Sequence, residues 1–359
     1  MNIIDRYIFK KYMTTFVFTL LIFTIIMVIF DVSERIDDFT AHDAPLSKIV
    51  TEYYAGFIPF YLNLLSPLIN FIAVIFFTSK MADQTEIVPI LSGGMSFYRM
   101  LRPYMLGAFL VFVFSFVSNV FIVPVTNKLK VGFENVYVKP DRVSKTAIST
   151  HMQVDSNSYV YIDHFETGSA IGYNFRLEKF EGDTMTEKLW ADRILWDSVA
   201  NKWNIENYSI RKIEGLKENM IYGKSMDTIL DMRPKDFEAY DNMFTVMTTK
   251  ELNERIEKEK IRGTGMMTDL LLEKYQRFIN PFAVFILTLM GVALSSKKVR
   301  GGIGLSLGIG IALSFVYIVL IHFATMFSSK GGLSPVVAVI LPTLIFLTLS
   351  VILILKAPK

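Results

Sequence analysis

Several groups that enzymes use are missing from the sequence. Its 359 residues include no cysteine, which excludes disulfides, iron–sulfur clusters and thiol chemistry. There is no Walker A motif, so the chain does not hydrolyse nucleotide unaided. The four histidines lack metal-ligand spacing, and the net charge of +3 is too small to indicate nucleic acid binding. We therefore expect a protein that is not an enzyme and holds no cofactor or metal of its own.

Charge is also missing from six long stretches of the chain. A membrane-spanning helix needs about 20 mostly apolar residues, and each stretch meets or nearly meets that length. The 52% content of hydrophobic residues agrees, because soluble proteins have about 45–50% even with glycine included. We predict six transmembrane helices, three before and three after a polar insert: Tyr12–Phe30, Tyr53–Ser79, Pro103–Asn127, Phe278–Ser296, Gly301–Ile321 and Gly331–Leu355.

These six stretches also lack the buried acid that a proton-coupled transporter usually carries. A charge in the bilayer costs at least about 2.5–3.5 kcal/mol, so proteins retain one there for function. Its absence argues against a secondary transporter. We expect any transport by this chain to be powered from outside it.

Lysine and arginine near the helix ends predict the orientation. The first stretch is expected to stay uncleaved, because no small-residue cleavage site follows it. The short loops on one side offer only Arg35, Lys48 and Lys330. We therefore predict a multi-pass protein of the bacterial inner membrane, with cytoplasmic termini and a periplasmic insert. The basic residues of the cytoplasmic side are Arg6, Lys10, Lys11, Lys80, Arg99, Arg102, Lys297, Lys298, Arg300, Lys356 and Lys359.

The insert has a different composition from the helices. It holds all three tryptophans and short alternating runs such as Tyr159–Ile162, separated by turn signals such as Glu181–Asp183. This pattern predicts an antiparallel sandwich or barrel. The charged segment Thr249–Arg262 is predicted to be a solvated helical connector. The predicted domains are helices 1–3 over residues 1–127, a β domain over 128–248, the connector over 249–277 and helices 4–6 over 278–359.

The segment Met81–Ser96 joins the second and third predicted helices on the cytoplasmic side. Asp83, Gln84 and Glu86 are followed by apolar residues. A short helix here could therefore dock in a groove of a partner protein, where one of these acids would pair with a base of that partner. Spacing alone favours an ordinary interfacial helix with a solvated glutamate. Pro89 either kinks this helix or lies at its start near Val88. The candidate contact residues are Asp83, Gln84, Glu86, Ile87, Ile90 and Leu91.

The fifth predicted helix begins with glycines at helical spacing, among them Gly304 and Gly308. Small residues three or four positions apart let two helices approach closely. Tight packing against a neighbour is the simpler interpretation, and a moving seam is the alternative.

Over nearly its whole length the chain resembles the LptF/LptG permease family of lipopolysaccharide export. No single motif carries this resemblance; the combination does, together with the six-helix plan. The opening Asp5–Tyr7 and the chain length are more similar to LptG than to LptF. The matching motifs are Asp5–Ile8, the helix with Pro59 and Pro67, Gln84–Ile87, Ser92–Ser96, Tyr159–Ile162, Tyr275–Phe278 and Pro281–Ala283.

The resemblance implies a non-catalytic subunit of an ABC transporter that extracts lipopolysaccharide from the inner membrane. It implies an LptF-like permease partner, an LptB-like ATPase dimer that binds ATP and magnesium, and an LptC-like protein that receives the lipid. The insert would be a β-jellyroll, and Met81–Ser96 would be the coupling helix with Glu86 as its acid. Helices 1 and 5 would be lateral gates, which gives Gly304 and Gly308 a role in gate packing.

Family members carry bases at the outer helix ends that suit lipid phosphates. In this sequence the acids Asp31 and Glu34 stand at the end of helix 1 instead. Interfacial snorkelling explains the remaining candidate bases as well as lipid binding does. A membrane scaffold with a periplasmic binding domain remains the alternative function, and a second copy of this chain remains an alternative partner. The candidate lipid-binding residues are Arg35, Lys128, Lys130, Lys274 and Arg277.

Overall fold

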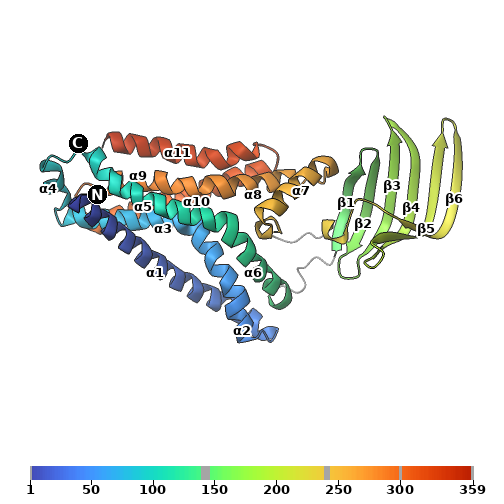
Figure 1. Cartoon of the computed structure of the whole chain (residues 1–359), viewed down its shortest axis with the longest axis horizontal. Helices are drawn as coiled ribbons and strands as arrows, with labels where there is room; N and C mark the ends of the chain where they lie inside the picture. Colours follow the sequence, from blue (N-terminus) through green and yellow to red (C-terminus); the bar gives the residue numbers. More distant parts are fainter. Residues whose placement is uncertain (1, 139–145, 238–242, 299–300, 357–359) are drawn as a thin grey trace. The chain divides into compact units, whose positions relative to one another are not determined.

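The computed structural model describes residues 2–138, 146–237, 243–298 and 301–356 (Figure 1). The chain divides into two compact units, which are described separately below. A helical unit comprises residues 1–133, 245–249 and 271–359, and a sheet unit comprises residues 134–244 and 250–270. Arg300 and Lys359, two of the bases used to predict the orientation, lie outside the described residues.

Within the described residues, six helical segments are long and apolar enough to cross a membrane, as predicted. The third continues ten residues beyond the predicted boundary at 127, because α6 ends at Tyr137. In order, the helical elements are α1 (Ile3–Ala41), α2 (Leu46–Lys48), η1 (Ile49–Tyr54), α3 (Ala55–Asp83), α4 (Ile87–Ser92), α5 (Phe97–Val117), η2 (Ser118–Ile122), α6 (Val123–Tyr137), α8 (Met267–Ile279), η5 (Asn280–Phe282), α9 (Ala283–Ser295), α10 (Gly302–Ser329) and α11 (Pro335–Leu355).

A chain of buried hydrogen bonds joins three helices of the helical unit. The hydroxyl of Tyr12 on α1 donates to the side-chain oxygen of Asn70 on α3. The amide of Asn70 donates in turn to the Thr288 hydroxyl on α9, at 2.7 Å. Such bonds satisfy polar groups that hydrocarbon cannot solvate. They fix α1 against the centre of the unit.

The sheet unit confirms the predicted all-β insert. Its six strands form one antiparallel sheet in which each strand pairs with the next along the chain. Tight turns make this order possible, since Gly182 and Gly215 adopt φ angles of +61° and +62° that favour glycine. The strands are β1 (Thr146–Asp155), β2 (Ser158–Glu166), β3 (Ile171–Glu181), β4 (Thr184–Asp197), β5 (Lys202–Glu214) and β6 (Lys217–Thr228).

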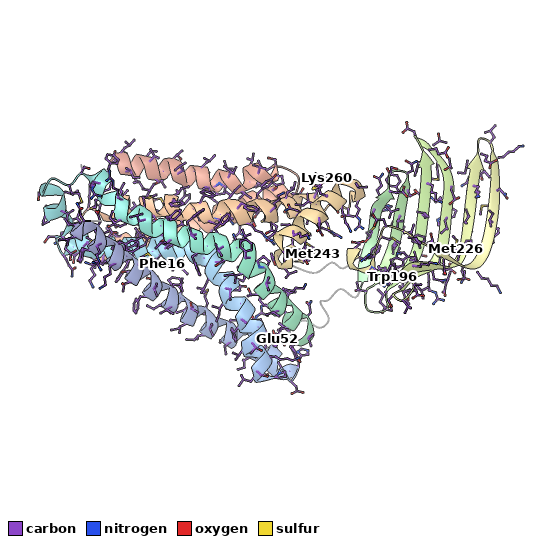
Figure 2. The ribbon with its side chains drawn as sticks, viewed as in Figure 1. Phe16, Glu52, Trp196, Met226, Met243 and Lys260 are labelled. Atoms are coloured by element: carbon purple, nitrogen blue, oxygen red, sulfur yellow. The ribbon has the colours of Figure 1, made fainter. Side chains whose placement is uncertain are left out.

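An aromatic core covers one face of this sheet. Phe237, from the segment after β6, stacks on Phe165 with ring centroids 4.4 Å apart. The indole N–H of Trp203 donates to the carbonyl of Met232 at 3.0 Å. Trp196 and Met226 pack against the same core (Figure 2). The segment after β6 is therefore held to the sheet by both packing and a hydrogen bond.

The helix α7 (Thr249–Arg262) is not the fully solvated connector that the sequence suggested. Its Leu252 and Ile256 are buried. Its Arg255 and Arg262 each place a guanidinium nitrogen 2.6 Å from the carboxylate of Asp236. The prediction was wrong because it treated all the charges of α7 as solvated, whereas two of them form a buried cluster with an acid outside the helix.

The same cluster lowers the pKa of Asp236. Burial alone would raise this pKa, but hydrogen bonds from Arg262 and the backbone N–H of Arg233, with the charges of Arg262 and Arg255, outweigh it. The ionised carboxylate therefore stabilises the sheet unit.

We expect Asp236→Asn to lower the free energy of unfolding of the sheet unit by about 3 kcal/mol, because two buried guanidinium groups lose their counter-charge. Urea unfolding of the full chain, followed by tryptophan fluorescence, measures this, since all three tryptophans lie on β4 and β5. Asp192→Asn, at an exposed position on β4, is the matched control. Equal unfolding midpoints for the two variants would contradict the role of the cluster.

The pH dependence follows from the direction of the shift. The stability contributed by Asp236 is complete above the ordinary aspartate pKa of 3.8 and is lost as the pH falls through the lower folded pKa. The variant has no such carboxylate to protonate. We expect the stability difference between wild type and Asp236→Asn to shrink below pH 3.8.

Candidate functional site

The segment between α3 and α5 forms a compact turn around the short helix α4. Thr85 adopts a left-handed conformation with φ of +57°, which ends the run of α3 and redirects the chain. Pro89 is the third residue of α4, within the first turn, where backbone N–H groups have no helical partner. The proline therefore does not kink the helix, which begins at Ile87. Gly94, with φ of +86°, follows the end of α4.

Glu86 immediately precedes α4 and is bound by two side chains of α1. The Tyr7 hydroxyl donates to its carboxylate at 2.8 Å, and the Lys11 ammonium lies 3.1 Å from the same oxygen. Lys11 also donates to the Tyr7 hydroxyl at 2.7 Å. Sequence analysis missed Tyr7 and Lys11 as partners of Glu86. The positions are 79 and 75 residues from it, and no local pattern signals such a contact.

A second ion pair ties α1 to the start of α5. Arg99 lies 3.0 Å from the carboxylate of Asp5, which is buried and also accepts the backbone N–H of Asn2. Lys298, beyond α9, donates to the carbonyl of Asp83 at 3.2 Å. These contacts gather the first turns of α1, the helix α4 and the first turn of α5 at one end of the helical unit (Figure 1). We refer to it as the α4 end.

The predicted contact residues of this segment divide into two groups. Ile87 is only 2% exposed and packs in the core of the helical unit, with Ile90 and Leu91 packed against that core. These three side chains anchor α4 to its own chain. Asp83 and Gln84 are exposed, and so is Val88, which the prediction omitted. The surface offered to a partner therefore consists mainly of polar groups and Val88.

Two of the predicted lipid-binding bases are engaged within the chain. Arg35 lies 3.2 Å from the carboxylate of Asp31, a buried residue that also accepts the hydroxyls of Tyr53 and Tyr54. Lys130 is 7% exposed, and its ammonium lies over the ring of Phe60 at 4.9 Å. Both bases therefore stabilise contacts between α1, η1, α3 and α6.

Arg277 is also buried, whereas Lys128 and Lys274 are accessible. The Arg277 guanidinium lies 2.7 Å from Glu273, one turn earlier on α8, and its backbone carbonyl accepts the Asn119 amide at 3.1 Å. Lys128 is exposed and Lys274 is half-buried. Neither lysine has an ion-pair partner in the part of the chain that the structure describes.

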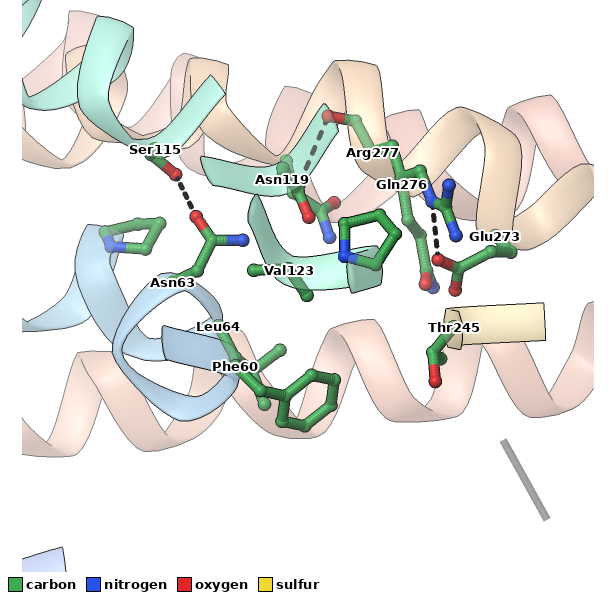
Figure 3. A pocket seen from close by; sticks show the side chains of 13 residues that line it. Phe60, Asn63, Leu64, Ser115, Asn119, Val123, Thr245, Glu273, Gln276 and Arg277 are labelled. Atoms are coloured by element: carbon green, nitrogen blue, oxygen red, sulfur yellow. Dashed lines mark hydrogen bonds and ion pairs between the residues drawn. The ribbon is translucent and has the colours of Figure 1, made fainter. Parts of the chain in front are cut away.

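A cavity of about 140 Å³ adjoins Arg277 (Figure 3). Its wall combines the apolar Phe60 and Leu64 with polar groups, among which the Ser115 hydroxyl donates to the Asn63 side-chain oxygen at 2.9 Å. Its charged lining residues, Glu273 and Arg277, neutralise each other. A cavity of this size with a few polar groups and no net charge suits ordered water rather than an ion. Among the five predicted bases, Arg277 alone lines it.

The two glycines predicted to pack a gate have no close packing partner among the described residues. A Cβ built on Gly304 or Gly308 meets no heavy atom of these residues within 4 Å beyond its chain neighbours and the adjacent backbone of α10. The close approach on α10 occurs instead at Gly310, where a Cβ would meet the tip of the Ile75 side chain on α3. Gly310, which the sequence analysis did not single out, is therefore a position of close packing between α10 and α3.

We expect Arg277→Gln to lower the melting temperature of the purified protein, because it leaves Glu273 without its counter-charge beside the cavity. Lys274→Gln, three residues away on the same helix, should leave the melting temperature within about 1 °C, since surface charges contribute little. Thermal unfolding in detergent compares the two. If Lys274→Gln lowered the melting temperature more than Arg277→Gln, Lys274 and not Arg277 would be the base that stabilises the fold.

Comparison with protein families gives a match over almost the whole chain. The family described as "Lipopolysaccharide export system permease LptF/LptG" matches residues 6–356. The match does not separate LptF from LptG. A comparison with curated proteins finds no significant match.

Proposed function

Because the chain belongs to the LptF/LptG family of lipopolysaccharide export permeases, we propose that it is the permease subunit of an ABC transporter that lifts lipopolysaccharide out of the inner membrane. The energy comes from a separate LptB-like ATPase dimer that binds ATP and magnesium. The lipid passes to an LptC-like protein and on toward the outer membrane. The opening Asp5–Tyr7 favours the LptG-like subunit, with an LptF-like chain as its partner.

The observation that carries this proposal is the placement of Glu86. It directly precedes a six-residue helix that packs Ile87, Ile90 and Leu91 against its own chain and leaves Val88, Pro89 and Ser92 exposed. A base on the ATPase can pair with this carboxylate, while Asp83 and Gln84 supply further polar contacts. Movement of the ATPase would then reach α1 through Tyr7 and Lys11. The α4 end faces the cytoplasm in this proposal, and the sheet unit is periplasmic.

The two proposed gate helices have little of their apolar surface covered by their own chain. In the most apolar window of α1 only 6% of residues are buried, and in that of α10 22%, against 61% for the segment Leu46–Asp83. Gly304 and Gly308 lie on the uncovered side of α10. This exposure supports a seam in which α10 of one subunit packs closely against α1 of the other.

The accessible bases define the proposed contact with the lipid. Lys128 on α6 and Lys274 on α8 are available to lipopolysaccharide phosphates. Arg35, Lys130 and Arg277 act from inside the protein, where they hold the surrounding helices in place. The lipid therefore meets fewer free charges on this chain than the sequence suggested.

We expect Glu86→Ala and Glu86→Lys to reduce the ATPase recovered with the tagged chain, or its turnover in nanodiscs, by about tenfold or more. Lys11→Met is the matched control for ATPase recovery, because it removes the charged α1 partner and leaves the carboxylate for the ATPase. A loss of recovered ATPase with Glu86→Ala but not with Lys11→Met supports direct docking.

Three other results would change the proposal. Equal losses in all three variants would assign Glu86 to the internal contact with α1. Full ATPase binding and turnover in both Glu86 variants would move the docking contact to other residues of α4. If the wild-type chain recovers no ATPase, the transporter proposal fails and a membrane scaffold with a periplasmic binding domain replaces it.

A further inference from the structure

A basic groove lies between α1 and α3 near the α4 end. Its volume is about 460 Å³, and its lining includes Lys10, Lys11 and Thr14 of α1 and Phe76 and Lys80 of α3. The groove is not explained by docking of an ATPase, because it lies on the flank of two membrane-spanning helices. It is also distinct from the cavity beside Arg277, with which it shares no lining residue.

The groove carries uncompensated positive charge. Lys10 and Lys80 are exposed, and the described residues supply neither ammonium with an ion pair or hydrogen bond. Lys11 is compensated, since it pairs with Glu86. Of the three ammonium groups that line the groove, that of Lys11 is therefore neutralised, and those of Lys10 and Lys80 are not. Two positive charges are left for a ligand.

The position of the groove along the helices matches the level of lipid phosphates. The uncharged stretch of α1 begins at Tyr12, directly after Lys11, and that of α3 ends at Ser79, directly before Lys80. The lysines therefore lie where hydrocarbon gives way to headgroups. Phe76 is 38% exposed in the same groove, which gives an acyl chain an apolar surface beside the charges.

We propose that this groove binds an anionic phospholipid of the leaflet on the α4 side, with the phosphate held by Lys10 and Lys80. Lysine binds phosphate as a compact point charge, and the Thr14 hydroxyl adds a donor. The acyl chains lie against Phe76. Only the orientation of the α4 end toward the cytoplasm is taken from the proposed function, and lipopolysaccharide export is not required.

Native mass spectrometry of the full chain, purified with its bound partners, tests the proposal. The probes are dioleoyl phosphatidylglycerol and dioleoyl phosphatidylcholine, which share acyl chains and differ in charge. We expect retention of phosphatidylglycerol over phosphatidylcholine. Each lysine near a membrane surface is worth about fivefold in affinity, so Lys10→Gln with Lys80→Gln should weaken phosphatidylglycerol binding by about 25-fold.

The controls separate the groove from surface charge in general. Arg102→Gln with Lys297→Gln removes the same charge at the same end of the protein, outside the groove, and should not change phosphatidylglycerol binding. Lys10→Arg with Lys80→Arg should keep the lipid preference and shows that the sites tolerate substitution. Equal weakening by the two neutralised pairs would overturn the proposal, as would no preference between the two lipids in the wild type.

A competition experiment distinguishes a lipid headgroup from a free anion. Inorganic phosphate at millimolar concentration should not displace phosphatidylglycerol, because the acyl chains contribute to its binding. Displacement would assign the groove to a soluble phosphate and overturn the lipid proposal. These outcomes are independent of the ATPase measurements on Glu86, so either proposal can fail without the other.

Discussion

The side chain of Asn70 is the constraint on which the helical unit depends. An amide buried among membrane helices must find its partners within the protein, because hydrocarbon offers none. Asn70 accepts from Tyr12 and donates to Thr288, so α1, α3 and α9 share one hydrogen-bonded centre. The apolar packing around it is non-directional and would tolerate several arrangements. The amide specifies one of them.

The contacts of the α4 end follow from that centre. Tyr12 fixes α1 next to α3, and Lys11, the residue directly before it on the same helix, can then reach Glu86. Asp5 reaches Arg99 from the first turn of α1. The segment proposed to couple to an ATPase is therefore joined directly to α1 by the ion pair of Glu86 with Lys11, without an intervening element. In the sheet unit Asp236 has a comparable role, because it joins α7 to the segment that closes the aromatic core.

The sequence predicted the parts of the fold that have a local signal. Charge-free stretches predicted the six helices, and alternating runs such as Tyr159–Ile162 predicted strands, because both depend on residues close in sequence. Charge alone was a poor guide to exposure. Lys130 and α7 find their partners in other elements of the chain, and Arg277 is buried although its partner Glu273 lies one turn away on the same helix.

The sequence identified residues of the candidate site but not the contacts that they make. The segment Met81–Ser96 was identified from its position between two apolar stretches, and motif resemblance gave Glu86 its expected role. The bonds of Glu86 to Tyr7 and Lys11 join residues too far apart for periodicity to detect. Gly304 and Gly308 have the spacing of a packing motif, yet within the described chain the close contact falls at Gly310. Spacing identifies a helix face that can pack closely, and it does not identify the neighbour.

The helix α1 has its buried side chains near its two ends and only partly buried or exposed side chains between them. Tyr12 and Phe16 are buried toward one end, Asp31 and Phe39 toward the other, and the intervening apolar side chains are largely exposed. A helix held near both ends can bend in its middle under a sideways force while its end contacts stay in place. It straightens again when the force is removed. A bulky molecule that presses on the middle of α1 would thus bend the helix while both attachments stay intact.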